Sequence, residues 1–326
     1  MVNSGKTLVT GGAGFIASNL IRKLLKNGAE VRATYFRRYP MVKHDDVDYV
    51  LADLTRPHDC ARIMKGVDTV YMCAANSSGA HVMATTPLVH LTPNIVMNAN
   101  CLAAAYEYGV KRFVFISSNT VYPLTDYAVS ESDAAFDFYP SYHVVGWMKR
   151  FSEVMCDMYA SRITRPMSVL VVRPGNLYGP FDKFTVKESK VIAALIRRAV
   201  QKELPFTVWG DGRDIKDFLY IDDFIDALIP LTEMANLSGP VNIASGIPVS
   251  IRDILPIILD AAGHHGVDLA FDESKPTMIP RRLIDISYLQ RLISWHPQVS
   301  ILDGIKKTVD WYKETYALQS PEAIHG

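Results

Sequence analysis

The sequence predicts an α/β fold in which one parallel β-sheet is covered by helices on both faces. Short runs of β-branched and aromatic residues alternate with helical patterns from the N-terminus to about residue 174. The strand runs are apolar throughout, which is typical of parallel strands that are buried on both faces. A glycine-rich turn also joins the first strand to the first helix. Together these three observations are typical of a doubly wound sheet.

The elements of the first half follow one another at short intervals. Strand patterns cover residues 6–10, 30–35, 47–53, 68–75, 111–118 and 167–174, and helical patterns cover residues 17–28, 60–67, 94–109 and 144–160. Alternation of this kind produces βαβ units, whose helices lie against the sheet. The pattern therefore predicts a Rossmann-type, doubly wound parallel sheet.

The alternation weakens after Pro174. Helical patterns there cover residues 189–202, 222–234, 251–262 and 302–316, and strand patterns lie near 206–210 and 217–221. No low-complexity stretch or linker separates the halves, so a smaller C-terminal domain is expected to be interwoven with the first. We expect residues 1–175 to form the sheet domain, with a return around 214–245. Residues 176–213 and 246–326 are expected mainly to form the smaller domain.

The composition excludes several classes of function. Lysine and arginine together number 34, as do aspartate and glutamate, so no overall basic field attracts nucleic acid or a membrane surface. The four cysteines form no C-x-x-C pair and the nine histidines have no metal-ligand spacing, so we expect reduced thiols and no metal site. The N-terminal sequence lacks a long apolar stretch, and we expect a cytoplasmic protein.

The turn after the first predicted strand carries the pattern of a dinucleotide site. In "TLVTGGAGFIASNLIRKLL", Gly11 and Gly14 lie between strand and helix, and Ala17 takes the last small position. Glycines there permit positive φ and let a pyrophosphate approach the backbone at the helix N-terminus, where Phe15 and Ile16 begin the helix. The placement at the start of an alternating chain favours dinucleotide binding over a ligand-free turn.

The end of the second predicted strand bears on the choice of cofactor. An acidic side chain there would bond the adenosine ribose and repel a 2′-phosphate. The sequence has Tyr35 at this place, followed by Arg37 and Arg38. Guanidinium groups bind phosphate bidentately, so we favour NADP, with NAD as the alternative. Asp53 is expected to face the adenine, and residues 73–76 are expected to line the dinucleotide.

Five segments distributed over nearly the whole chain resemble the nucleotide-sugar branch of the extended short-chain dehydrogenase/reductases. They are "TGGAGFIA", "FVFISSNTVYP", "RPGNLYGP", "VWGDGRDIKDFLYIDD" and "PRRLIDISYLQRLISWHP". The NAD-dependent epimerase/dehydratases belong to this branch, and the resemblance is strongest to its GDP-fucose synthase type. It implies an NAD(P)-dependent enzyme with a nucleotide-sugar substrate, bound mainly by the smaller domain. It also implies a homodimer formed through helices near 98–108 and 144–160.

The resemblance implies a catalytic trio of serine, tyrosine and lysine. Counted back from "VYP", the serine is Ser118, and Tyr142 and Lys149 supply the other two groups. Tyrosine has an ordinary pKa of about 10, so a neighbouring ammonium is needed for acid/base work at neutral pH. The cofactor residues implied by the resemblance are Gly11, Gly14, Phe15, Ile16, Tyr35, Arg37, Arg38, Asp53, Leu54, Ala74, Ala75, Asn94, Ser117, Tyr142, Lys149 and Pro174.

The segment "YPSYHVVGWMKR" (139–150) departs from the spacing of the family. The family has a tyrosine four residues before the lysine, a glutamate four residues after it, and a further tyrosine six residues later. Lys149, Glu153 and Tyr159 match the second part of this pattern. Val145 therefore stands where the tyrosine belongs, and Tyr142 lies three residues earlier. Three residues equal about 300° and about 4.5 Å along a helix, so Tyr142 stays near the same face but further back.

Tyr142 reaches the site if the helix begins late or if a bulge absorbs the extra residues. Pro140 and Ser141 suit a helix start, and Tyr139 is a weaker alternative for the acid/base role. In the opposing interpretation Tyr142 is only a packed aromatic residue and Lys149 only a solvated one.

The resemblance also implies the residues that bind the substrate. Arg281 is expected to contact the diphosphate through charge-assisted bonds. The full expected set is Ser118, Asn119, Asn176, Lys190, Val191, Val208, Lys216 and Arg281.

Two positions restrict the expected reaction. GDP-fucose synthase-type enzymes use a cysteine and a histidine to exchange protons on the sugar carbons, and this chain has Thr120 and Lys190 at those places. Because threonine is too weak an acid for this exchange, we expect hydride transfer at C4 of a sugar that is GDP-linked, as a 4-ketoreductase or 4-dehydrogenase. The alternatives are a 4-epimerase or a catalytically impaired NAD(P)-binding regulatory protein.

Overall fold

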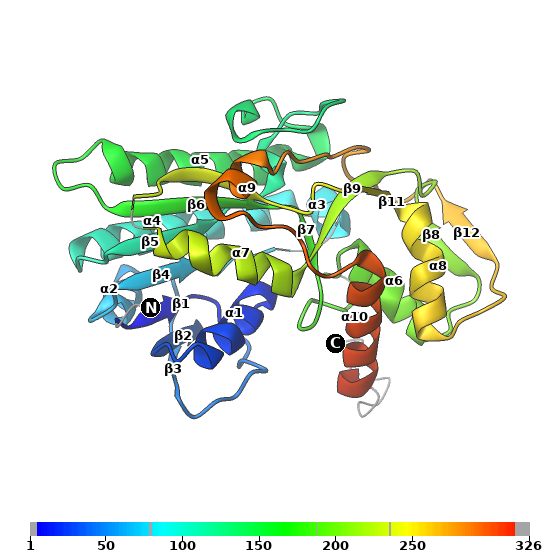
Figure 1. Cartoon of the computed structure of the whole chain (residues 1–326), viewed down its shortest axis with the longest axis horizontal. Helices are drawn as coiled ribbons and strands as arrows, with labels where there is room; N and C mark the ends of the chain where they lie inside the picture. The colour runs from blue at the N-terminus through cyan, green and yellow to red at the C-terminus, as the bar shows by residue number, and fades with distance from the viewer. Residues whose placement is uncertain (1–4, 78–79, 187, 235, 317–326) are drawn as a thin grey trace.

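The protein is built around a seven-stranded parallel sheet (Figure 1). The computed structural model describes residues 5–77, 80–186, 188–234 and 236–316. The strand order is β10-β6-β5-β4-β1-β2-β3. Strands β2 and β3 are therefore added on one side of β1, and β4, β5, β6 and β10 on the other, so the strand order reverses between β1 and β4. The strands are β1 (Thr7–Val9), β2 (Val31–Tyr35), β3 (Val47–Leu51), β4 (Thr69–Met72), β5 (Arg112–Ile116), β6 (Ser168–Pro174) and β10 (Gly239–Ile243). The predicted Rossmann-type fold is confirmed.

Helices cover both faces of this sheet because its strands are apolar on both sides. Leu8 of β1 packs into one core cluster and its neighbour Val9 into the other. One face carries α1 (Phe15–Lys26) and α7 (Ile221–Glu233), which contact each other. The other face carries α2 (Pro57–Met64), α4 (Thr92–Glu107) and α5 (His143–Ser161). Within the described ranges, no helix combines the length and apolar character that a membrane span requires.

The smaller part of the protein lies beside the C-terminal end of the sheet (Figure 1). Its helices α6 (Val191–Val200), α8 (Ile251–Ala262) and α10 (Ile301–Tyr316) pack on one another. Two small sheets accompany these helices. One is formed by β7 (Asn176–Tyr178), β9 (Ile215–Tyr220) and β11 (Pro248–Ser250). The other is formed by β8 (Phe206–Trp209) and β12 (Leu269–Asp272). Two short helices, α3 (Ala80–Thr85) and α9 (Ser287–Ile293), complete the α-helices.

The two parts share one hydrophobic core. A single cluster extends from Val9 and Leu20 in the sheet part to Leu255 and Val309 in the smaller part. The chain also returns to the sheet at β10, which pairs with β6 after the excursion through β7, β8 and β9. The expected division into two domains stays a proposal, because this core crosses the boundary.

The N-terminal end of α5 explains the glycine at position 146. A 3₁₀ turn, Pro140–Tyr142, precedes the helix, so Tyr142 lies just before its first residue, His143. A Cβ atom on Gly146 would lie 2.6 Å from the Phe138 ring and 2.9 Å from the carbonyl oxygen of Thr120. Position 146 therefore accepts only glycine, because the helix packs there against the turn that follows β5.

We predict that Gly146→Ala destabilises the protein. Overpacking costs about 1–3 kcal/mol, which exceeds the gain in helix propensity of about 1 kcal/mol. Urea unfolding should show a lower midpoint for this variant, whereas the exposed Asp157→Ala on the same helix should change stability by less than about 0.5 kcal/mol. A Gly146→Ala protein as stable as the wild type would contradict the packing argument.

Candidate active site

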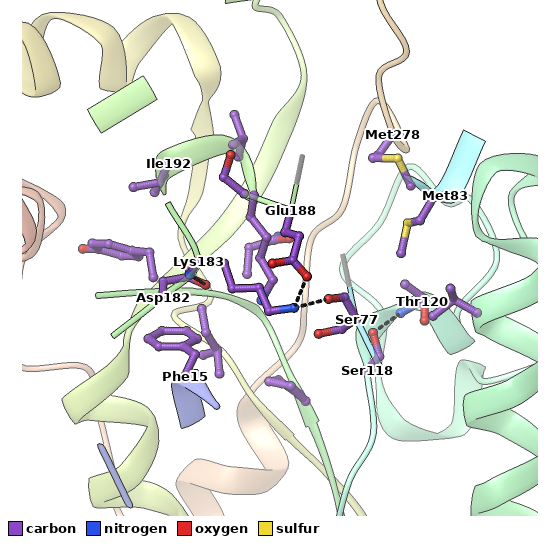
Figure 2. A pocket seen from close by; sticks show the side chains of 18 of the residues that line it. Phe15, Ser77, Met83, Ser118, Thr120, Asp182, Lys183, Glu188, Ile192 and Met278 are labelled. Carbon is purple, nitrogen blue, oxygen red and sulfur yellow. Dashed lines mark hydrogen bonds and ion pairs between the residues drawn. The ribbon is translucent and has the colours of Figure 1, made fainter. Parts of the chain in front are cut away.

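A cavity of about 450 Å³ lies at the carboxyl ends of the parallel strands, between the sheet and the smaller part (Figure 2). Met72, Ile116 and Pro174, which end β4, β5 and β6, line it, as does Gly14 after β1. The opposite wall comes from α6, β8 and β9. We call this the central cavity. Its position at the reversal of strand order is where doubly wound folds bind their ligands.

The glycine turn below the central cavity is shaped for a close backbone approach. Gly11 has φ +68°, and a Cβ there would lie 2.8 Å from Cα of Ala74. The Thr10 hydroxyl accepts hydrogen bonds from the amides of Cys73 (3.1 Å) and Ala74 (3.0 Å), which holds the ends of β1 and β4 together. Gly14 caps α1 without a side-chain hydrogen bond, so the first helical amides face the cavity. This arrangement fits a dinucleotide pyrophosphate.

Most of the residues expected along the cofactor line the central cavity. They are Gly14, Phe15, Ile16, Ala74, Ala75, Asn94, Ser117, Tyr142, Lys149 and Pro174. Asn94 supports the loop after β4, since its side-chain oxygen accepts from the Asn76 amide (2.7 Å) and its nitrogen donates to the Asn76 carbonyl (3.0 Å).

The residues expected at the adenosine end lie outside the cavity lining. They are Gly11, Tyr35, Arg37, Arg38, Asp53 and Leu54. The Asp53 carboxylate accepts bonds from the amide (3.1 Å) and hydroxyl (2.7 Å) of Thr55, and Leu54 is buried in the core. Arg38 is paired with Glu188 at 2.8 Å. The contact of these six residues with a cofactor stays a prediction.

Lys149 is held at the end of β5. Its ammonium donates to the Ile116 carbonyl oxygen (2.7 Å) and lies 5.0 Å from the centre of the Phe115 ring. Burial lowers the pKa of Lys149 to about 8, and the nearby Glu153 carboxylate opposes this shift. The lysine is therefore a half-buried group whose ammonium is held at the strand end by the Ile116 carbonyl.

Ser118 follows the end of β5, where the Ile116 carbonyl holds Lys149. Its hydroxyl oxygen accepts a hydrogen bond from the Thr120 amide (3.2 Å) and lines the central cavity. The preceding Ser117 instead donates to Glu153 (2.5 Å). The two serines thus have different tasks, because only Ser118 presents a hydroxyl that no other described side chain uses.

Tyr142 lines the same cavity, and its hydroxyl lies near Ile279 and Arg282. Burial raises its pKa to about 12, while Arg282 and a backbone hydrogen bond at Ile279 act in the opposite direction. Val145 also lines the cavity, one turn before Lys149. The helix starts late, at His143, and Tyr142 lines the cavity with its phenol directed toward the 279–282 segment; its catalytic role stays a prediction.

The expected substrate residues divide into two groups. Ser118, Asn119, Asn176, Lys190, Val191, Val208 and Lys216 line the central cavity. Lys216 donates to the Ile279 carbonyl oxygen and pairs with Asp214 at 3.2 Å. Arg281 does not line this cavity: it is exposed in a separate shallow hollow with residues 123–127. Its neighbour Arg282 is the buried one and donates to the carbonyls of Tyr122 and Pro123.

Several cavity residues escaped the sequence analysis. Arg197 and Arg198 lie on α6 and line the cavity, and within the described residues the Nε atom of each has no hydrogen-bond partner. Two arginines in the apolar helix "VIAALIRRAV" were the signal that could have revealed them. Other missed polar residues of the lining include Ser77, Asp182, Lys183, Glu188 and Asp214.

Comparison with known proteins decides the family. The model described as "NAD dependent epimerase/dehydratase family" matches residues 7–244. The chain belongs to this family. GDP-L-fucose synthase 1 of Arabidopsis thaliana is 32% identical over 317 residues, which cover 95% of this chain and 93% of that protein. GDP-mannose 3,5-epimerase of the same plant is 28% identical, with 95% and 82% covered.

A solved structure agrees with this assignment. The UDP-glucuronic acid 4-epimerase of Bacillus cereus, in complex with UDP-glucuronic acid and NAD, superposes with a TM-score of 0.83 at 26% identity. The match covers 95% of this chain and all of that one. As a member of the epimerase/dehydratase family, the protein is an NAD(P)-dependent enzyme of nucleotide-sugar chemistry.

We predict that Lys149→Met changes how stability depends on pH. Burial lowers the pKa of Lys149 from 10.5 to about 8, so folding releases a proton between these values and the wild type gains stability as pH rises. The variant lacks this gain. Urea unfolding at about pH 7.5 and about pH 9.5 should show the wild type improving by about 1–2 kcal/mol relative to the variant. A difference that does not vary with pH would contradict the burial of this ammonium.

Proposed function

We propose that the protein is a cytoplasmic enzyme that transfers hydride between NADP(H) and C4 of a GDP-linked sugar, as a 4-ketoreductase or 4-dehydrogenase. The proposal rests on one observation: the proposed catalytic residues, the dinucleotide turn and α6 all line the central cavity. Ser118, Tyr142 and Lys149 line the same cavity as Gly14 of the dinucleotide turn and Arg198 of α6. The likeness to GDP-L-fucose synthase and GDP-mannose 3,5-epimerase supports a GDP-sugar.

Each residue of the trio has a distinct role in this proposal. Ser118 orients the C4 oxygen through its cavity-facing hydroxyl, and Lys149 holds the nicotinamide ribose. Tyr142 passes the proton to or from the C4 oxygen. The nicotinamide supplies or accepts the hydride. Val191 and Val208 form an apolar wall beside the sugar nucleotide, and Arg197 and Arg198 are the proposed cationic partners of its diphosphate.

The state of Tyr142 favours the reducing direction. Because burial raises its pKa to about 12, the phenol keeps its proton at neutral pH. A protonated phenol can donate to the C4 oxygen as hydride arrives, whereas oxidation of an alcohol would first require the phenol to lose that proton. The phenol therefore begins in the protonation state that ketone reduction requires.

The surroundings of Thr120 support the proposal that the enzyme does not epimerise two sugar carbons. Its hydroxyl is buried in the cavity wall, and among the described residues it has no hydrogen-bond partner. An unactivated hydroxyl cannot exchange a proton on a sugar carbon. A 4-epimerase is the second candidate, favoured by the likeness to the Bacillus cereus 4-epimerase, because re-reduction at the same carbon needs only the trio.

We predict that Tyr142→Phe lowers kcat by about 10²- to 10⁴-fold, because it removes the proton donor without changing the ring. The assay follows NADPH and NADH at 340 nm with GDP-, UDP- and dTDP-linked 4-keto sugars, and a product analysis detects epimers. Adding Val145→Tyr to this variant restores the family spacing and should recover part of the lost activity. Val145→Phe in the same background is the matched control and should recover none.

Two outcomes contradict the proposal. Unchanged kcat in Tyr142→Phe would remove Tyr142 from the chemistry. Tight cofactor binding without turnover over the whole panel would favour a regulatory protein that has lost catalysis.

We also propose a homodimer through α4 and α5, in line with exposed apolar side chains on α5. Trp147, Phe151 and Met158 are exposed, and their spacing of four and seven residues places them on one helix face. We predict that Phe151→Asp converts the protein to monomers in light scattering, while Leu302→Asp, an exposed apolar residue on α10, leaves the mass unchanged. A monomeric wild type would contradict the proposal.

A further inference from the structure

Between β7 and α6, Glu188 and Lys183 tie the chain to the residues that follow β2 and β4. Glu188 pairs with Arg38 (Nη2 to Oε2, 2.8 Å) and with Lys183 (Nζ to Oε1, 3.0 Å). Lys183 also donates to the carbonyl oxygen of Ser77 (2.7 Å), and Figure 2 shows both bonds of this lysine. Glu188 thus connects a segment of the cavity wall to the residues that follow β2 and β4.

Glu188 lies between the central cavity and Arg38. Glu188, Lys183 and Ser77 line the cavity, whereas Arg38 does not. The Glu188 side chain is only 27% exposed, and its burial alone would raise its pKa. The two cations outweigh this effect and lower the pKa, so the carboxylate is ionised at neutral pH. Arg38 is therefore already in an ion pair, with a carboxylate that it shares with Lys183.

Arg38, the arginine of this ion pair, is also the group that would recognise an adenosine 2′-phosphate. The other arginine after β2, Arg37, lies over the ring of Phe36 at 5.7 Å and has no acidic partner in the described part of the chain. A 2′-phosphate bound by Arg38 must displace Glu188 or lie beside its charge, and both arrangements cost free energy. NAD has only a hydroxyl at this position, so its binding does not require Arg38 to leave Glu188.

We propose that Glu188 is a residue that sets cofactor selectivity: it competes with the 2′-phosphate of NADP for Arg38 and so weakens NADP relative to NAD. The inference rests on the proposed function only in placing the adenosine ribose at the end of β2. It has a structural consequence, because NADP and not NAD removes the attachment of Glu188 to Arg38. The Lys183 attachment to Ser77 is independent of the 2′-phosphate and remains.

The test is a binding measurement on the full chain with Glu188→Gln, which keeps the shape of the side chain and removes its charge. We expect the Kd of NADPH to fall about three- to tenfold and the Kd of NADH to change by less than about twofold. The fragments 2′-phospho-AMP and AMP should show the same contrast, and higher salt should reduce it. Glu30→Gln, which removes a carboxylate paired with Lys6, is the matched control and should leave the ratio unchanged.

A double-mutant cycle separates competition from a general charge effect. In the background Arg38→Met, Glu188→Gln should no longer change the ratio of NADPH to NADH affinity, because the shared partner is gone. Equal shifts for both dinucleotides, or an effect that persists without Arg38, would overturn the inference. These are binding readouts, so loss of turnover with every sugar would count against the proposed function and leave this result standing.

Discussion

The buried ion pair between Glu153 and Arg173 is the constraint on which the geometry of the site depends. The two side chains are 3% and 1% exposed and are joined by bonds of 2.8 and 2.9 Å. The Ser117 hydroxyl also donates a hydrogen bond to Glu153, and Arg173 also donates one to the Tyr122 hydroxyl. Since Glu153 is on α5, Arg173 on β6 and Ser117 after β5, the pair fixes the helix against two strand ends. An unpaired charge at this depth would be costly, so the three elements have little freedom to shift.

This fixed helix determines where the tyrosine can be. Lys149 is one turn before Glu153, and its bond to the Ile116 carbonyl follows from that position. Gly146 is pressed against Phe138 and Thr120, so the helix cannot slide to bring an earlier residue forward. The side chain one turn before Lys149 is Val145. Because that position holds a valine, the phenol that lines the cavity comes from Tyr142, just before the helix.

The sequence allowed the fold to be predicted because strand and helix periods are local signals. The sheet strands, the glycine turn and the register of Lys149 with Glu153 are all readable within about 20 residues. Distant pairings were not readable: Arg38 and Glu188 are 150 positions apart, and nothing in either neighbourhood indicates the other. Arg281 was misplaced for a related reason. In "PRR" the two arginines are equivalent by sequence, and only tertiary packing turns Arg282 inward and Arg281 outward.

The equal numbers of acidic and basic residues conceal a strong local imbalance. The lining of the central cavity includes six basic side chains, Lys149, Lys183, Lys190, Arg197, Arg198 and Lys216, and three acidic ones, Asp182, Glu188 and Asp214. The excess is what a cavity needs if it is to hold two diphosphates, one from a dinucleotide and one from a sugar nucleotide. Lys183 and Lys216 are already paired with Glu188 and Asp214. Three of the other four cations, Lys190, Arg197 and Arg198, lie at the two ends of α6, and Glu203 offsets part of this charge because it pairs with Arg198 at 3.7 Å. We therefore expect α6 to contribute most of the remaining electrostatic attraction for a substrate diphosphate.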